Sequence, residues 1–139
     1  MLVSNQRGTV NELAEKFEAD PADFVCAGCK SDTLAAFCAD CDFIPCARGK
    51  GVEFCVDCGD YPCERLTDFR DDEWAHHSVV TNNLERLREV GVEAWLAEQD
   101  ERWTCPACGA RFSWYDEKCP DCGAETYDAR AEEEDLKTD

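Results

Sequence analysis

The sequence has no long hydrophobic run and little positive charge. No stretch approaches the roughly 18 apolar residues of a membrane-spanning helix, so we expect no membrane association. Only 14 of the 139 residues are lysine or arginine, against 32 aspartates and glutamates, and the formal net charge is −18. Phosphate backbones and anionic membrane surfaces repel so acidic a chain, which makes nucleic acid an unfavourable partner.

Histidine is scarce, and no catalytic group of residues is recognisable. His76 and His77 are the only histidines. A cysteine nucleophile would need a base and an orienting group beside it, and the pattern supplies no such set. We interpret the two histidines as polar residues at the end of a helix. The sequence therefore favours a non-enzymatic role.

A recognisable secretory leader is also missing, whereas cysteine is abundant. Residues 1–10, MLVSNQRGTV, contain no basic region followed by an apolar run. We therefore expect a cytoplasmic protein whose thiols stay reduced. Twelve cysteines, many at C-x2-C spacing, then indicate metal ligands rather than disulfides.

The last four cysteines form two copies of the pattern C-P-x-C-G. The copies begin at Cys105 and Cys119. Two residues between the cysteines let both sulfurs reach one ion, and the following glycine accepts the positive φ of the turn. The segment between the copies predicts a short hairpin with Phe112 and Trp114 covering one side. This pattern predicts a zinc ribbon.

Eight further cysteines lie between residues 26 and 63. The spacing Cys38-x2-Cys41-x4-Cys46 recurs 17 residues later, beginning at Cys55, which indicates duplication of a small metal-binding loop. Eight sulfurs suffice for two tetrahedral ions, but sequential and interleaved divisions are equally buildable. The predicted ligands are Cys26, Cys29, Cys38, Cys41, Cys46, Cys55, Cys58, Cys63, Cys105, Cys108, Cys119 and Cys122.

The predicted cofactor is zinc, three ions per chain, with iron as the alternative. Iron–sulfur clusters and rubredoxin-like iron also use four thiolates. Ferredoxin-type runs, however, bring three cysteines together at x2 spacing and continue with Cys-Pro. Here proline precedes the cysteine, in Pro45-Cys46 and Pro62-Cys63, and no C-x2-C-x2-C occurs.

The predicted fold is a small, irregular, metal-stabilised α+β structure. Its parts are an N-terminal helical arm, an eight-cysteine zinc-knuckle core, a helical segment, a zinc ribbon and a disordered acidic tail. Their ranges are 1–21, 22–66, 67–100, 101–124 and 125–139. The arm is amphipathic, the segment without cysteines has helical periodicity, and the tail has few apolar residues.

Together these runs resemble a known family. The run from CAGCKSD to FCADCDFIPCARGKGVEFCVDCGDYPCERL is similar to the cysteine-rich domain of unknown function 3795, as are NNLERLREVGVEAWL, Trp103 and WTCPACGARFSWYDEKCPDCG. The resemblance covers about residues 10–124. It implies a metal-binding protein without an established activity.

Three functions remain open on the sequence. The favoured one is a structural zinc protein that acts as a protein–protein interaction or assembly module, with a protein as its partner. The alternatives are an iron-containing electron-transfer or redox protein and a nucleic-acid-binding zinc protein. The net charge of −18 disfavours the last of these.

Overall fold

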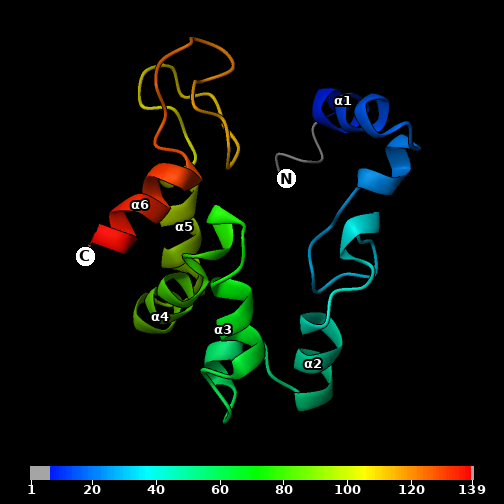
Figure 1. Ribbon diagram of the computed structural model, residues 1–139, viewed down its shortest axis with the longest axis vertical. Helices are drawn as coiled ribbons and strands as arrows, with labels where there is room; N and C mark the ends of the chain where they lie inside the picture. The colour runs from blue at the N-terminus through cyan, green and yellow to red at the C-terminus, as the bar shows by residue number, and fades with distance from the viewer. Residues whose placement is uncertain (1–6, 139) are drawn as a thin grey trace. The chain divides into compact units, whose positions relative to one another are not determined.

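The computed structural model describes residues 7–138, whose regular secondary structure is almost entirely helical. The chain divides into an N-terminal unit, Met1–Glu53, and a C-terminal unit, Phe54–Asp139. The N-terminal unit contains α1 (Arg7–Phe17), η2 (Pro21–Phe24), η3 (Ala36–Cys38) and α2 (Phe43–Lys50), drawn in blue to teal in Figure 1. None of the helices in residues 7–138 is long and apolar enough to cross a membrane.

The N-terminal unit has a very small apolar core. Val10 and Ala14 of α1 are buried against Phe24 of η2, and Leu13 packs at the edge. The helical spacing of these residues places them on one face of α1. Phe17 extends this face by stacking on Phe24 with ring centroids 6.0 Å apart, but it stays 60% exposed. So small a core contributes little stability on its own.

Helix η2 starts where the sequence carries a start signal. The Asp20 side chain accepts the N–H of Ala22 at 2.8 Å, and Pro21 occupies the first position. The first N–H groups of a helix have no partner within the helix. Asp20 accepts one of them, and Pro21 has no N–H that needs a partner. The described part of the arm expected over residues 1–21 contains α1 and the first residue of η2.

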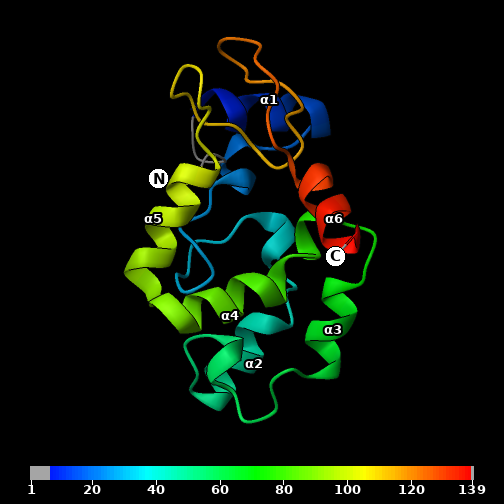
Figure 2. The ribbon, with the colours of Figure 1, turned by 90° about the vertical axis from the view of Figure 1, so that its left-hand side faces the viewer.

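The C-terminal unit contains the remaining helices. They are η4 (Cys55–Asp57), α3 (Glu64–Arg70), η5 (Ala75–His77), α4 (Val80–Val90), α5 (Val92–Arg102) and α6 (Ala129–Thr138). Helix α5 follows α4 after a bend at Gly91 and packs against it (Figure 2). Gly91 has φ +85°, which glycine adopts at little cost. The apolar residue Leu87 is buried on α4.

Periodicity alone suggests a continuous helix over residues 64–77, but the structure breaks it. Helix α3 ends at Arg70, and the Asp72 carboxylate accepts the N–H of Trp74 at 2.9 Å. A short aspartate side chain that satisfies a nearby backbone N–H offers an alternative to the helical bond. The chain therefore turns before η5, and this turn places Trp74 and the two histidines beside the later loops.

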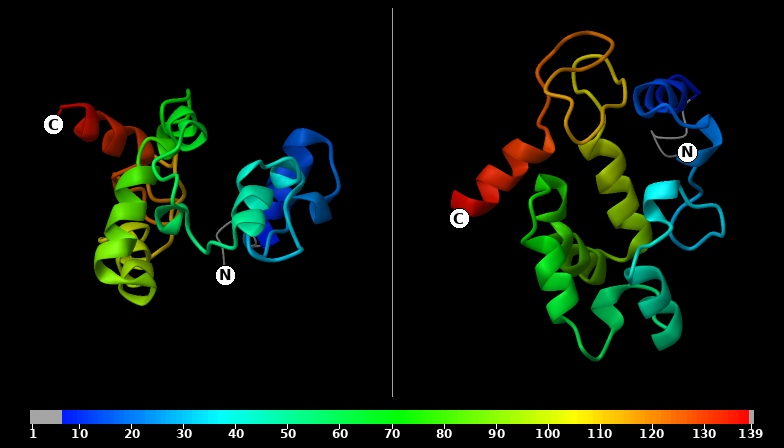
Figure 3. Two further views of the ribbon diagram at one scale, coloured as in Figure 1. Left: turned by 90° about the horizontal axis from the view of Figure 1, so that it is seen from below. Right: turned by 45° about the vertical axis from the view of Figure 1, so that its right-hand side comes forward.

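The acidic tail, which the sequence analysis expects to be disordered, contains helix α6. Asp128 is buried and accepts the N–H of Ala131 at 2.9 Å, which caps the helix start. Arg102 bonds Glu132 at 3.1 Å, and α6 packs beside η5 (Figure 3, right). Disorder is expected from the sequence because the tail is acidic and has few apolar residues. The tertiary contacts that stabilise α6 are not apparent from the sequence.

The α+β expectation is not supported. In the described residues, pairing of the β type is limited to two isolated bridges, Thr104 with Arg111 and Lys118 with Glu125. The segment between α5 and α6 is accordingly drawn as loops without arrows in Figure 1. The cysteine turns use the neighbouring backbone groups, as in the bond from Gly109 N–H to the Cys105 carbonyl.

Candidate metal centre

Four cysteines of the C-terminal unit converge on one point. The Sγ atoms of the C-terminal tetrad, Cys105, Cys108, Cys119 and Cys122, all lie within 4.8 Å of one another. The Sγ atoms of Cys105 and Cys122 are 3.8 Å apart, and those of Cys108 and Cys119 are 3.5 Å apart. Four sulfurs bound at about 2.3 Å to one tetrahedral ion would lie about 3.8 Å apart. The tetrad therefore fits a single metal ion.

Two equivalent turns build the tetrad. The Cys105 N–H donates to the Ala110 carbonyl at 2.8 Å, and the Cys119 N–H donates to the Ala124 carbonyl at the same distance. Gly109 and Gly123 close the turns at φ +78° and +72°. Other residues rarely adopt this backbone conformation, which explains glycine after each second cysteine. The repeated sequence C-P-x-C-G thus folds twice into the same shape.

A small apolar cluster packs against the tetrad. Phe112 is buried against Cys105 and Cys119, and Trp103 packs at the edge, 5.6 Å from Phe112 between ring centroids. Cys108 and Cys122 are exposed. Phe112 thus takes the covering position expected of it, whereas Trp114 is 49% exposed and packs elsewhere.

Backbone N–H groups act on the tetrad sulfurs. The N–H groups of Cys122 and Asp121 favour the thiolate of Cys119 and lower its pKa to about 7. The N–H of Ala110 also lowers the pKa of Cys108, but hydrogen bonds with the Cys119 and Cys122 thiols outweigh it and raise the pKa to about 12. The backbone N–H groups of both turns therefore favour the thiolate form. Thiolates are the form that binds metal.

The other eight predicted ligands do not converge to the same degree. Within residues 7–138, the C-terminal tetrad is the one group of three or more potential ligands whose atoms come so close. Cys29 is exposed and the other seven are partly exposed. All twelve cysteines lie in the described part of the chain, and none forms a disulfide. The ligand role of these eight stays a prediction.

The duplicated cysteine loop is nevertheless visible in the backbone. The Cys41 N–H donates to the Cys38 carbonyl at 3.2 Å, and the Cys58 N–H donates to the Cys55 carbonyl at 3.0 Å. Both C-x2-C pairs are therefore closed by the same turn. The copies diverge at the last cysteine, because Cys46 lies inside α2 whereas Cys63 precedes α3.

The two histidines lie apart from the tetrad in an aromatic cluster. His76 stacks on Trp114 with ring centroids 4.0 Å apart, and its Nδ1 lies 2.8 Å from the Tyr115 hydroxyl. Burial and the neighbouring His77 lower the pKa of His76 to about 4. His77 Nδ1 lies 2.8 Å from the Asp72 carboxylate. No sequence pattern indicates this contact, since 39 positions separate His76 from Tyr115.

Comparison with known proteins yields one match. Residues 3–68 match the family described as a protein of unknown function (DUF3795). The matched segment holds the eight cysteines from Cys26 to Cys63 and ends before the C-terminal tetrad. The likeness expected beyond residue 68 therefore stays a prediction.

Two further comparisons give no match. Neither the curated proteins nor the solved structures contain one that matches this chain.

Proposed function

We propose that the chain is a structural zinc-binding protein that serves as a protein–protein interaction or assembly module. The observation that carries the proposal is the convergence of the four tetrad sulfurs within 4.8 Å. Cys105 and Cys108 from one turn and Cys119 and Cys122 from the other would hold the ion, as in a zinc ribbon. Cytoplasmic location is part of the same proposal, because the thiols must stay reduced.

A single ion suits the tetrad better than a cluster does. In an iron–sulfur cluster the four thiolates are distributed over two or four iron atoms, so sulfurs on different irons lie farther apart than sulfurs around one ion. The pairs at 3.5 and 3.8 Å match a mononuclear site. A single iron ion binds the same four thiolates, so iron is the alternative to zinc. A measurement of the bound metal distinguishes the two.

Four thiolates around one ion support a structural role. A catalytic zinc site keeps one position open for water or substrate, whereas a closed set of four cysteines stabilises the fold. Zinc would join two turns that share only a small apolar cluster, formed by Phe112 and its neighbours. The ion would then supply much of the folding free energy of this segment.

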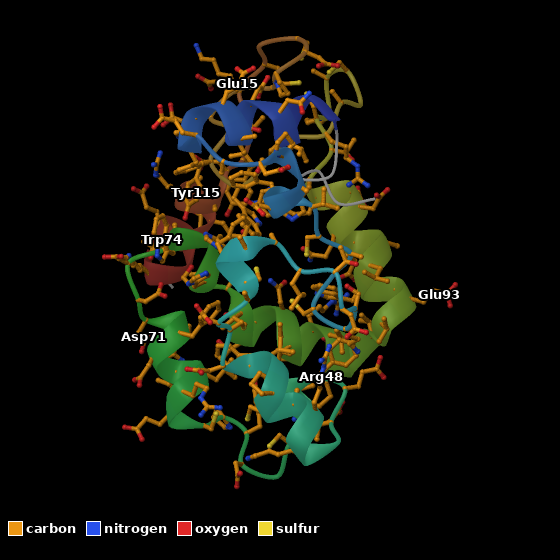
Figure 4. The ribbon with its side chains drawn as sticks, turned by 90° about the vertical axis from the view of Figure 1, so that its right-hand side faces the viewer. Glu15, Arg48, Asp71, Trp74, Glu93 and Tyr115 are labelled. Carbon is orange, nitrogen blue, oxygen red and sulfur yellow. The ribbon has the colours of Figure 1, made fainter. Side chains whose placement is uncertain are left out.

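Exposed aromatic residues support a protein partner. Trp74 is 51% exposed and Trp114 is 49% exposed, and His76 lies between them, 6.4 and 4.0 Å from their ring centroids. Trp74 and Tyr115 lie on the same side of the C-terminal unit, close to α6 (Figure 4). Tryptophan is enriched at the energetic centres of protein interfaces. The acidic run 71–73 beside Trp74 would favour a partner with positive charge.

Nucleic acid is a poor partner for the same surface. Arg102 pairs with Glu132, Arg111 with Asp100, and Arg130 with Glu117. These three pairs neutralise cations that a phosphate backbone would need. The net charge of −18 adds repulsion at longer range.

The zinc assignment is tested by removing two tetrad ligands. The full-length double variant C108S/C122S, purified without oxygen, should hold one metal ion fewer per chain than the unmodified protein. The matched control S113A changes an exposed residue between the two turns and should keep every ion. An unchanged metal count in C108S/C122S would rule out a metal site at the tetrad.

The partner assignment is tested on metal-replete protein. Crosslinking in the native host should capture the same protein repeatedly with the unmodified chain and severalfold less of it with W74S/W114S. The variant E93Q changes a residue on α5 that projects outward (Figure 4) and serves as the control. Equal capture by all three proteins would contradict a role for this aromatic surface.

A further inference from the structure

The first C-x2-C pair carries a metal-knuckle hydrogen bond. The Gly28 N–H donates to Cys26 Sγ at 3.4 Å, and Gly28 has φ +97°. In the C-terminal tetrad the same relation, from residue i+2 to the sulfur of residue i, joins Ala110 to Cys108 and Asp121 to Cys119. A backbone N–H that bonds a sulfur stabilises its thiolate, the form that binds metal.

The loop after this pair is held in a defined shape. The Ala27 N–H donates to the Thr33 carbonyl at 2.9 Å, and the Ser31 hydroxyl donates to the Gly28 carbonyl at 2.8 Å. Arg48 of α2 donates to the Ser31 carbonyl at 3.2 Å. The loop therefore returns toward the chain that follows it and positions Cys29 for the next pair.

The second pair of the same unit is closed as a turn. Helix η3 ends at Cys38, and the Cys41 N–H donates to the Cys38 carbonyl at 3.2 Å. This turn keeps the two sulfurs on a short arc, as C-x2-C spacing requires for binding one ion. Both pairs lie in the N-terminal unit, which is compact by itself.

The two pairs are also electrostatic neighbours. The charges of Cys41 and Cys26 act on the Cys29 thiol, so the two pairs lie within electrostatic reach of each other. Cys38 likewise lies within reach of the charges of Cys29, Cys26 and Cys41. Cys55, Cys58 and Cys63 belong instead to the C-terminal unit, so the four cysteines of the two pairs form a set within one compact unit.

We propose that Cys26, Cys29, Cys38 and Cys41 bind one thiolate-preferring divalent ion within the N-terminal unit. The sulfurs would close from their present spacing onto the ion. This assignment selects the sequential division of the eight cysteines over the interleaved one and excludes Cys46 from the first ion. It rests on the proposed role of the cysteines as metal ligands but not on the C-terminal tetrad.

The experiment uses cadmium-113 as a spectroscopic replacement for the native ion in the full chain. Couplings between each cadmium nucleus and the β-protons of its cysteine ligands assign four cysteines to each resonance without any mutation. The proposal expects Cys26, Cys29, Cys38 and Cys41 on one resonance. A resonance coupled to Cys46 and to Cys26 or Cys29 would overturn the proposal. The absence of any cadmium coupling to the four proposed ligands would overturn it as well.

Pairs of serine variants give a second readout by native mass spectrometry. C29S, C41S and the double variant C29S/C41S should each hold one ion fewer than the unmodified chain, because the two residues share that ion. Losses that add up in the double variant would contradict the proposal. C46S should keep the ion that C29S loses.

The ion at the C-terminal tetrad is the internal control. A resonance coupled to Cys105, Cys108, Cys119 and Cys122 shows that the chain is folded and loaded. If that resonance is present and the first is absent, the inference fails while the proposed function stands. If the tetrad resonance is absent and the first is present, the metal site proposed at the C-terminal tetrad fails while the inference stands.

Discussion

At the scale of single residues, backbone conformation at two glycines decides the geometry of the C-terminal tetrad. Gly123 has φ +72°, and a Cβ added there would meet no atom within 4 Å. The cost of alanine is therefore conformational rather than a clash, about 1–2 kcal/mol. Because the strain falls on the turn that positions Cys119 and Cys122, we expect G123A to weaken metal binding.

This prediction is checked by chelator competition on metal-loaded protein. G123A should release the tetrad ion at about tenfold lower chelator concentration than the unmodified chain. The control G49A lies within α2, has no positive φ and would meet no atom within 4 Å. Alanine is a better helix former than glycine, so G49A should be neutral or stabilising. Equal release from all three proteins would contradict the account of the turn.

A second prediction at this scale concerns pH and His76. Burial lowers its pKa from 6.5 to about 4, so the folded protein keeps His76 neutral where the unfolded chain binds a proton. The stability that depends on neutral His76 is therefore complete above pH 6.5 and falls as the pH drops toward 4. In H76F, which keeps a ring beside Trp114, this part of the pH dependence should disappear.

The measurement is urea unfolding of both metal-loaded proteins at pH 7.5 and pH 5.5. Acid also releases metal from thiolates, so only the difference between the two proteins reports on His76. The unmodified chain should lose more stability than H76F over this interval. Parallel losses would show that His76 titrates as a solvated side chain does.

At the scale of elements, helix α6 depends on its first residues more than on its composition. Asp128 is buried and its carboxylate accepts the Ala131 N–H at 2.9 Å. Removing such a cap costs about 1 kcal/mol. D128A should therefore lower the free energy of unfolding by about that amount and increase amide exchange along α6.

The matched control for this helix is E134Q, an exposed change in the same element. It should leave amide exchange in α6 almost unchanged. Equal exchange in D128A and the unmodified chain would mean that packing against η5 alone holds the helix.

The elements were predictable from sequence where local signals act alone. Residue spacing and glycine conformation predicted the two C-P-x-C-G turns, and helical periodicity predicted helices in the segment without cysteines, where α4 and α5 lie. Helix α6 could not be predicted, because its stabilising contacts with η5 and Arg102 come from distant parts of the chain. The helix breaks after Arg70 because the Asp72 side chain accepts the backbone N–H of Trp74. Hydrophobic periodicity does not reveal such a bond.

The candidate site was predictable to a similar extent. Spacing identified the C-terminal tetrad, whose sulfurs the structure brings together. It could not divide the cysteines from Cys26 to Cys63, because sequential and interleaved sets satisfy the same local geometry. The cluster of His76, Trp114 and Tyr115 was missed, since only tertiary packing joins it.

At the scale of the whole molecule, apolar burial is too limited to explain a stable fold. Among the described residues, Leu66 and Cys105 are the largest side chains that are fully buried. Domains with small cores are usually stabilised by disulfides or metals, and none of the twelve cysteines forms a disulfide. Metal should therefore carry much of the folding free energy.

Strong chelation tests this dependence directly. Complete removal of metal should abolish most of the helical circular dichroism and the cooperative thermal transition, and returning zinc should restore both. Apo-protein that keeps its helicity and a cooperative transition would show that side-chain packing alone suffices.

The central claim is that the cysteines bind structural metal, and one measurement tests it most directly. Metal ions and acid-labile sulfide are counted per chain on protein purified without oxygen. About three zinc ions and no sulfide are expected, since four thiolates complete each site. Iron accompanied by sulfide, or no bound metal at all, would contradict it.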